Sequence, residues 1–405
     1  MTSAEHATGR RWLVVLGIVV LAFNLRPAAV SVGPVLGEVR DGLGMSGAVA
    51  GVLTSLPVLA FAVFGALAPR AARLVGLHRM TLLALVCVVV GLGLRSAVSN
   101  IPLFLLLSLL ALAGMASANV LLPSLVKLHF PDRIGLMTSI YSTSLAIGLT
   151  SASVLTVPIS QAYGGWRSGL LVWAVTAGIA ALPWLALIAE DRRAGRVPDE
   201  AGSTVGLGEV ARTRLGWLMA LFFGLQSMQA YAIFGWFAQV YRDAGFSPST
   251  AGLLLGAITG ISIPLSFAVP AVAARLHNQA PLMWALMACY PIGYVGLVVA
   301  PHGGALAWAL LVGTGTATFP LILTLIGLRA RTPYGTAALS GFTQSAGYLL
   351  AIVGPFGVGV LHDLSGSWTL PLLVLAAINV PQLIVGLALS RPAYIEDELA
   401  RNQVG

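Results

Sequence analysis

Long runs of apolar residues, separated by short clusters of charged and turn-forming residues, dominate this chain. Twelve of the runs reach about 18 residues or more, the length that an α-helix needs to cross the hydrocarbon core of a bilayer. The pattern therefore predicts an all-α membrane protein with twelve transmembrane helices. We expect these helices near residues 12–36, 46–68, 80–97, 101–126, 134–160, 168–189, 214–240, 249–273, 281–300, 304–328, 336–361 and 369–390.

Landmarks in the first half of the chain recur 202 residues later. The pairs are Val39-Arg40-Asp41 with Tyr241-Arg242-Asp243, Ala71–Leu74 with Ala273–Leu276, Pro131 with Pro333, Trp166 with Trp368, and Cys87 with Cys289. One offset shared by five landmarks indicates an internal repeat. It predicts two six-helix halves, 1–189 and 214–405, joined by a cytoplasmic linker at 190–213, with a short cytoplasmic tail at the end.

Composition agrees with a membrane protein. Apolar residues make up 58% of the chain and charged residues only 9%, with a mean hydropathy of +0.91. Because a soluble domain carries about 25% charged residues, a chain this poor in charge could not cover its surface in water. The net charge of +8 does not indicate a nucleic-acid partner, since the sequence has no basic patch with interleaved aromatic residues. We expect membrane lipid as the partner and a monomeric protein.

The distribution of Lys and Arg predicts the orientation. Of the 22 basic residues, 17 fall on the side of the expected spans that carries both termini, and Arg26 lies within a span. The opposite side holds four, namely Arg40, Arg95, Arg167 and Arg242. Because cytoplasmic loops carry the excess of basic residues, both termini are predicted on the cytoplasmic side of an inner membrane.

Arg26 is the charged residue that the sequence places deep within a span. All 14 acidic residues are expected at span ends or in loops, and all six histidines in loops or tails. Arg26 follows Trp12 by 14 residues, about 21 Å of helix in a hydrocarbon core about 30 Å thick. A charge there costs about 2.5–3.5 kcal/mol on insertion scales, so we expect it to face a cavity and an anionic solute. The alternative is an arginine that snorkels or is satisfied by backbone carbonyls.

Proline and amides surround this arginine and recur on the other spans that we expect to line the site. Pro27 predicts a helix kink that exposes polar groups to a cavity, although a packing kink is an alternative. Amides and hydroxyls can bind a polar solute or join helices at about 0.6 kcal/mol each, and for threonine we favour the second role. The candidate substrate-binding residues are Arg26, Asn24, Asn119, Gln226, Gln229, Tyr231, Thr318, Gln344 and Tyr348.

Basic residues after the second and eighth spans form a candidate cytoplasmic gate. They are Arg70, Arg73 and Arg275. Their charge could close the inner gate or contact anionic lipid headgroups, and a role in topology alone is an equal alternative.

Two motifs carry a family resemblance. Gly65, Arg70 and Arg73 resemble the G-x-x-x-D-R-x-G-R signature of the major facilitator superfamily, with Pro69 and Ala72 departing from it. Asn24–Pro27, Ser31–Leu36 and Ala50–Pro57 resemble the bacterial cyanate and 2-nitroimidazole transporter family. The resemblance implies two pseudo-symmetric six-helix bundles, a solute site near the membrane midplane between them, and a small polar or anionic substrate that is taken up or extruded.

These observations favour a transporter that moves a small anionic or polar, cyanate-like solute by alternating access. An exporter of drugs or nitroaromatic compounds is the alternative, with Phe23, Tyr231, Trp236 and Tyr348 dominating the pocket. An enzyme is excluded because no Asp, Glu, His or Lys is expected within the membrane to build a catalytic site or bind a metal. We expect no cofactor.

Overall fold

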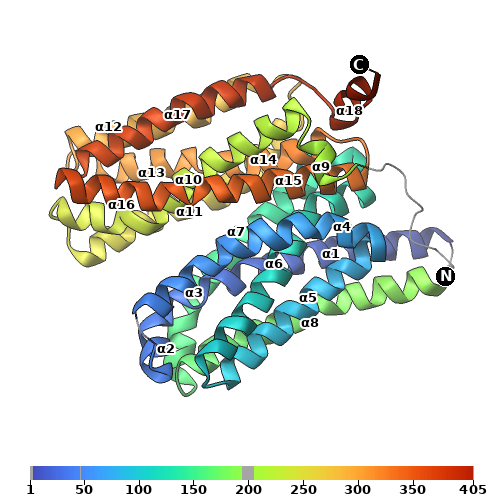
Figure 1. Cartoon of the computed structure of the whole chain (residues 1–405), viewed down its shortest axis with the longest axis horizontal. Helices are drawn as coiled ribbons and strands as arrows, with labels where there is room; N and C mark the ends of the chain where they lie inside the picture. The colour runs from blue at the N-terminus through green and yellow to red at the C-terminus, as the bar shows by residue number, and fades with distance from the viewer. Residues whose placement is uncertain (1–2, 46, 194–204, 405) are drawn as a thin grey trace. The chain divides into compact units, whose positions relative to one another are not determined.

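The computed structural model describes residues 3–45, 47–193 and 205–404, and these residues are almost entirely helical (Figure 1). Among them, twelve helices are long and apolar enough to cross a membrane. The predicted all-α fold with twelve candidate transmembrane helices is therefore confirmed.

The first part of the chain runs from α1 to α8. Its elements are α1 (Ser3–Val30), the 3-10 turn η1 (Gly33–Val35), α2 (Leu36–Leu43), α3 (Gly47–Ala60), the π-helical turn η2 (Phe61–Gly65), α4 (Ala66–Val75), α5 (Leu77–Ala97), α6 (Ile101–His129), the 3-10 turn η3 (Pro131–Arg133), α7 (Ile134–Ala162) and α8 (Trp166–Arg193).

The second part runs from α9 to α18. Its helices are α9 (Leu207–Val210), α10 (Arg214–Asp243), α11 (Pro248–Ala273), α12 (Ala280–Val299), α13 (Ala305–Gly315), α14 (Thr318–Leu328), α15 (Pro333–Ala351), α16 (Val353–Ser365), α17 (Thr369–Leu389) and α18 (Ile395–Val404).

The helices form two compact units. Unit 1 contains Met1–Asp132, Ile140–Leu207 and Thr332–Gly341, and unit 2 contains Arg133–Ser139, Gly208–Arg331 and Phe342–Gly405. The start of α7 thus belongs to unit 2, and the start of α15 belongs to unit 1. In the predicted linker at 190–213, residues 194–204 lie outside the described residues, and α8 continues to Arg193 before them. The predicted division into halves stays a prediction.

Small residues allow the helices of each unit to pack closely. In unit 1, a Cβ placed on Gly114 of α6 would lie 2.2 Å from the carbonyl oxygen of Ala84 in α5. In unit 2, a Cβ on Gly313 of α13 would lie 2.6 Å from the carbonyl oxygen of Ile258 in α11. Glycine at these points lets two backbones approach, as is common where membrane helices pack through van der Waals contact.

Three segments differ in detail from the predicted spans. The loop expected after the second span is instead helical, because η2 and α4 continue the helix to Val75. The tenth span consists of two helices, α13 and α14, separated by a turn at Thr316 and Ala317. The histidines were predicted to lie in loops or tails. This is wrong for His78, His129 and His362, which lie in the end turns of α5, α6 and α16.

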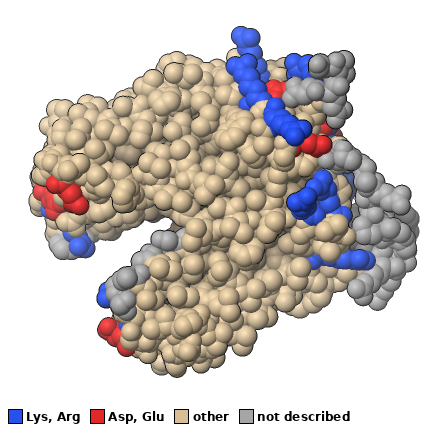
Figure 2. Space-filling model, viewed as in Figure 1, with Lys and Arg blue, Asp and Glu red and all other residues tan. Residues whose placement is uncertain are grey.

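The charged residues lie where a membrane protein needs them. On the face in view, Figure 2 shows Lys, Arg, Asp and Glu side chains near the helix ends and uncharged surface along the helices between them. Large apolar side chains such as Leu253 of α11 and Phe356 of α16 are exposed. Apolar surface this extensive suits hydrocarbon and not water.

Candidate solute-binding residues

Arg26 lies four residues before the end of α1, within a candidate membrane span, and its side chain is half-buried. Pro27 follows it inside the helix, which continues to Val30. The backbone N–H of Ser31 donates a hydrogen bond to the Pro27 carbonyl at 3.1 Å, so helical hydrogen bonding persists past the proline. Arg26 is not without a partner, since it takes part in an interaction within the protein. Any role in solute binding therefore rests on its position and charge.

Asn24 points to a different side of α1. Its Nδ2 donates to the Val20 carbonyl at 2.8 Å, and the side chain is buried. It lines a mostly apolar cavity of about 400 Å³ with residues of α1, α7 and α8. Because two residues span about 200° of a helix, Asn24 and Arg26 lie on nearly opposite faces. The structure does not bring these two predicted site residues together.

Asn119 of α6 lies in a long, unbroken run of buried residues in unit 1. Every residue from Ala111 to Val126 is buried, and Asn119 itself is 3% exposed. This helix packs against α1, α3 and α5. The amide therefore sits among helices of its own unit, where a role in helix packing competes with solute binding.

In unit 2, aromatic side chains of α10, α14 and α15 form a cluster. The ring of Tyr348 lies 6.1 Å from that of Tyr231 and 5.0 Å from that of Phe223, measured between ring centroids. Phe319 lies 6.0 Å from Phe223. Close approach of α10 and α15 at Gly224 and Gly347 makes this contact possible. The predicted residues Tyr231 and Tyr348 are thus brought together.

The predicted glutamines are all buried, and one of them has a clear structural role. Gln229 of α10 donates through Nε2 to the Leu375 carbonyl at 2.9 Å, and its Oε1 accepts from the Tyr294 hydroxyl at 2.8 Å. It thereby links α10 to α17 and α12. Gln226 and Gln344 are 1% and 0% exposed, and Gln344 shares the continuous helix α15 with Tyr348.

Thr318 begins α14, and a turn at Thr316 and Ala317 separates it from the threonine of α13, Thr314. The Thr318 hydroxyl is fully buried and donates to the Gly315 carbonyl at 2.8 Å. This backbone hydrogen bond is the role that we favoured for the threonines.

The candidate gate residues are exposed. Arg70 and Arg73 lie on α4, and Arg73 Nη1 donates to the Val205 carbonyl at 3.3 Å within unit 1. Arg275 follows the end of α11 in unit 2. Pro69, which departs from the superfamily signature, is buried against α15, where a Cβ on Gly341 would lie 2.6 Å from its Cγ. The gating role of these three arginines stays a prediction.

Buried arginines were missed by sequence reasoning. Arg95 was counted among the basic residues at the outer end of the span predicted at 80–97, and its burial was not foreseen: it lies in the last turn of α5, is 1% exposed and donates to the Ser31 hydroxyl at 3.0 Å. Arg329 is 3% exposed and donates to Gln279 Oε1 at 2.9 Å and to the Leu389 carbonyl at 2.8 Å. Both arginines lie at helix ends. There the sequence indicates the position of a charged residue along the span, but not whether the packed helices bury its side chain.

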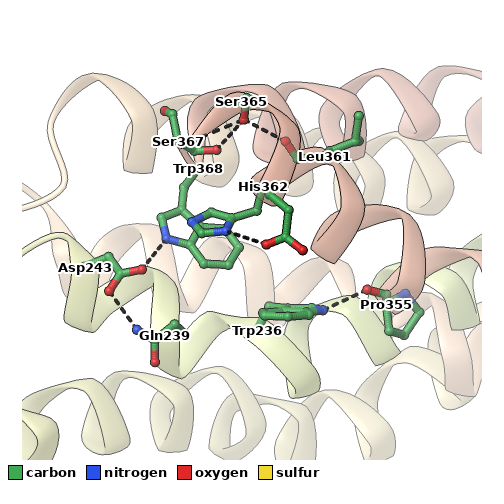
Figure 3. Close-up of polar contacts among 10 residues, drawn as sticks. Trp236, Gln239, Asp243, Pro355, Leu361, His362, Ser365, Ser367 and Trp368 are labelled. Carbon is green, nitrogen blue, oxygen red and sulfur yellow. Dashed lines mark hydrogen bonds and ion pairs between the residues drawn. The ribbon is translucent and has the colours of Figure 1, made fainter.

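Two landmarks of the repeat meet in unit 2 (Figure 3). Asp243 at the end of α10 accepts a hydrogen bond from Trp368 Nε1 at 2.7 Å, and a second from Gln239 at 2.7 Å. His362 of α16 stacks on Trp368 with a centroid distance of 3.9 Å. The repeat identified Asp243 and Trp368, and the structure adds their contact, which joins the ends of α10, α16 and α17.

Comparison with known proteins identifies the family. The sequence model of the Major Facilitator Superfamily matches residues 13–355. The chain is 39% identical to the uncharacterized transporter YycB of Bacillus subtilis (strain 168) over 96% of each protein. It is 33% identical to the 2-nitroimidazole transporter of Escherichia coli (strain K12), covering 98% of this chain and 100% of the relative.

A further relative and a solved structure extend the comparison. The cyanate transport protein CynX of Escherichia coli (strain K12) is 28% identical, covering 88% of this chain and 91% of CynX. The proton:xylose symporter XylE has the same fold, with a TM-score of 0.74 and 12% identity over 99% of this chain and 100% of that one. The predicted resemblance is confirmed, and the chain is a multi-pass membrane transporter, not an enzyme. It belongs to the major facilitator superfamily.

Proposed function

We propose that this transporter moves a small anionic or polar solute across the bacterial inner membrane by alternating access, with both termini in the cytoplasm. The observation that carries the proposal is the guanidinium of Arg26, half-buried in α1 within a candidate span. Arginine keeps its charge in every environment and offers a planar set of donors to an anion. Relatives named for cyanate and 2-nitroimidazole agree with a compact polar solute.

Unit 2 supplies most of the other candidate residues, and Asn119 of unit 1 is added to them. The half-buried Tyr231 ring, which packs beside the buried ring of Tyr348, presents apolar surface with a hydroxyl, which suits a small solute that is partly apolar. We keep Gln344 and Asn119 as candidates for polar contacts. Gln229 and Thr318 are left out of the proposed site, because their hydrogen bonds join helices of unit 2.

Uptake into proteoliposomes tests the role of Arg26. Arg26→Gln removes the charge but keeps polar character and length. Because a hydrogen bond to a charged group contributes about 1.5–3 kcal/mol, we expect a 10- to 100-fold loss of kcat/KM for an anionic solute. Arg242→Gln, which removes an exposed charge at the end of α10, is the matched control. Uptake by Arg26→Gln equal to that of the control would refute the proposal.

The aromatic cluster of unit 2 favours a second candidate function, the export of drugs or nitroaromatic compounds. The half-buried rings of Tyr231 and Phe319 offer faces on which a flat molecule can stack, and the buried rings of Tyr348 and Phe223 pack against them. Cells that express the protein would then resist nitroaromatic compounds. Loss of resistance with Tyr348→Ala, and full resistance with Arg26→Gln, would favour export over anion transport.

A further inference from the structure

The C-terminal helix α18 is attached to the rest of unit 2 through its first turn and the residue before it. Asp397 accepts hydrogen bonds from both terminal nitrogens of Arg331, and the Tyr394 ring lies 4.6 Å from the same guanidinium. Glu398 Oε2 accepts the backbone N–H of Leu215 at 3.0 Å. We call residues Tyr394–Glu398 the tail clasp.

A buried side chain and two backbone contacts complete the attachment. Ile395 is fully buried, and its N–H donates to the Arg329 carbonyl at 2.9 Å. Glu396 Oε1 accepts the N–H of Arg331 at 2.9 Å. The tail clasp therefore holds the connection between α14 and α15 by its backbone as well as by its side chains.

The tail clasp holds two of the five connections by which the chain passes between unit 1 and unit 2. Arg331 is the last residue of unit 2 before Thr332–Gly341, which belongs to unit 1. Leu215 lies in the first turn of α10, shortly after the chain passes from unit 1 to unit 2 between Leu207 and Gly208. One short helix is thus bound to both connections.

The contacts of the tail clasp are suited to reversible release. The Arg331–Asp397 pair has the bidentate geometry that makes an ion pair specific, but it is exposed, so its strength is modest and depends on salt. The N–H of Leu215 is one of the donors that a helix leaves unsatisfied at its start, and Glu398 also places negative charge at the positive end of α10. Several weak contacts acting together can open without unfolding unit 2.

We propose that the tail clasp is a built-in restraint on the transport cycle. While it is closed, the segments around Leu215 and Arg331 are fixed to unit 2, and its opening frees both of them and speeds conformational exchange. The restraint itself does not depend on which solute the protein carries, and only its effect on uptake rests on the proposed function.

Hydrogen exchange of the protein in nanodiscs, followed by mass spectrometry, tests the restraint. Asp397→Asn is expected to raise exchange in residues 329–341 about threefold, and Glu398→Gln to do the same in residues 214–218. The double variant Arg331→Asp with Asp397→Arg exchanges the two charges and so restores the ion pair. Hydrogen exchange in residues 329–341 of this variant should be close to that of the wild type. Arg391→Gln is the matched control, because among the described residues this tail arginine makes no hydrogen bond or ion pair.

Removal of residues 391–405 gives the fully released state. We expect faster exchange in both segments, unchanged exchange in the core of α12, and a severalfold higher initial uptake rate. Wild-type exchange in both segments of the truncated chain would overturn the restraint. Faster exchange with an unchanged or lower uptake rate, for a solute that the wild type carries, would overturn its effect on the transport cycle. Since hydrogen exchange needs no solute, a failure here is distinguishable from a failure of the Arg26 proposal.

Discussion

Substitution of Gln229 distinguishes most clearly between two roles for a buried amide, binding of the solute and stabilisation of the helix packing. Gln229→Leu keeps a side chain of similar size but removes both the hydrogen bond to the Leu375 carbonyl and the one from the Tyr294 hydroxyl. All three groups are buried between α10, α12 and α17, so the two partners find no water in exchange. The substitution should therefore lower stability and leave solute affinity unchanged.

The size of the effect follows from the two lost hydrogen bonds. Side-chain hydrogen bonds between membrane helices contribute about 0.6 kcal/mol on average and up to about 1.7, so the loss should be about 1–3 kcal/mol. For a unit of about 200 residues, 1 kcal/mol shifts Tm by about 2–4 °C, which gives a fall of about 2–12 °C.

Thermal unfolding of the purified protein in detergent measures this fall. A double-mutant cycle with Tyr294→Phe isolates the Tyr294 contact, for which we expect a coupling energy of about 0.6–1.7 kcal/mol. An unchanged Tm together with a raised KM for Gln229→Leu would refute the reasoning and return this residue to the solute site.

Two further predictions concern packing in unit 1 and the contact drawn in Figure 3. Gly148→Ala would place its Cβ 2.0 Å from the Phe23 carbonyl oxygen, so we expect a loss of about 1–3 kcal/mol or more and a lower Tm. Gly178→Ala, with nothing within 4 Å, is the control and should be neutral or stabilising by about 0.5–1 kcal/mol; equal Tm values would contradict the packing. Trp368→Phe keeps the ring but removes the donor to Asp243, which should cost about 0.5–1.5 kcal/mol. If the losses from Trp368→Phe and Asp243→Asn simply add in the double variant, the contact contributes nothing.

The spans and the family could be predicted from the sequence because both are properties of the chain itself. The length of an apolar run determines whether a helix can cross the bilayer, so the twelve candidate spans follow directly from the pattern. The position of Arg26 in α1 follows from the same count. The repeat also identified Asp243 and Trp368 as landmarks before any contact was known.

The directions of side chains could not be predicted, because they depend on which helices pack together. Gln226 and Gln229 read alike in sequence, but Gln229 is bonded to α12 and α17. Asn24 and Arg26 are two residues apart and lie on nearly opposite faces of α1. Arg95 and the contacts of α18 escaped notice because charged residues at helix ends look like loop residues until the packing is known.

Binding of small anions to the purified transporter, measured by isothermal titration calorimetry, tests the central claim most directly. The proposal requires that an anion such as cyanate binds the wild-type protein and the Arg242→Gln control equally. It further predicts that Arg26→Gln, folded to the same Tm, binds that anion at least tenfold more weakly. Equal affinity of Arg26→Gln and wild type for every anion that binds would contradict it.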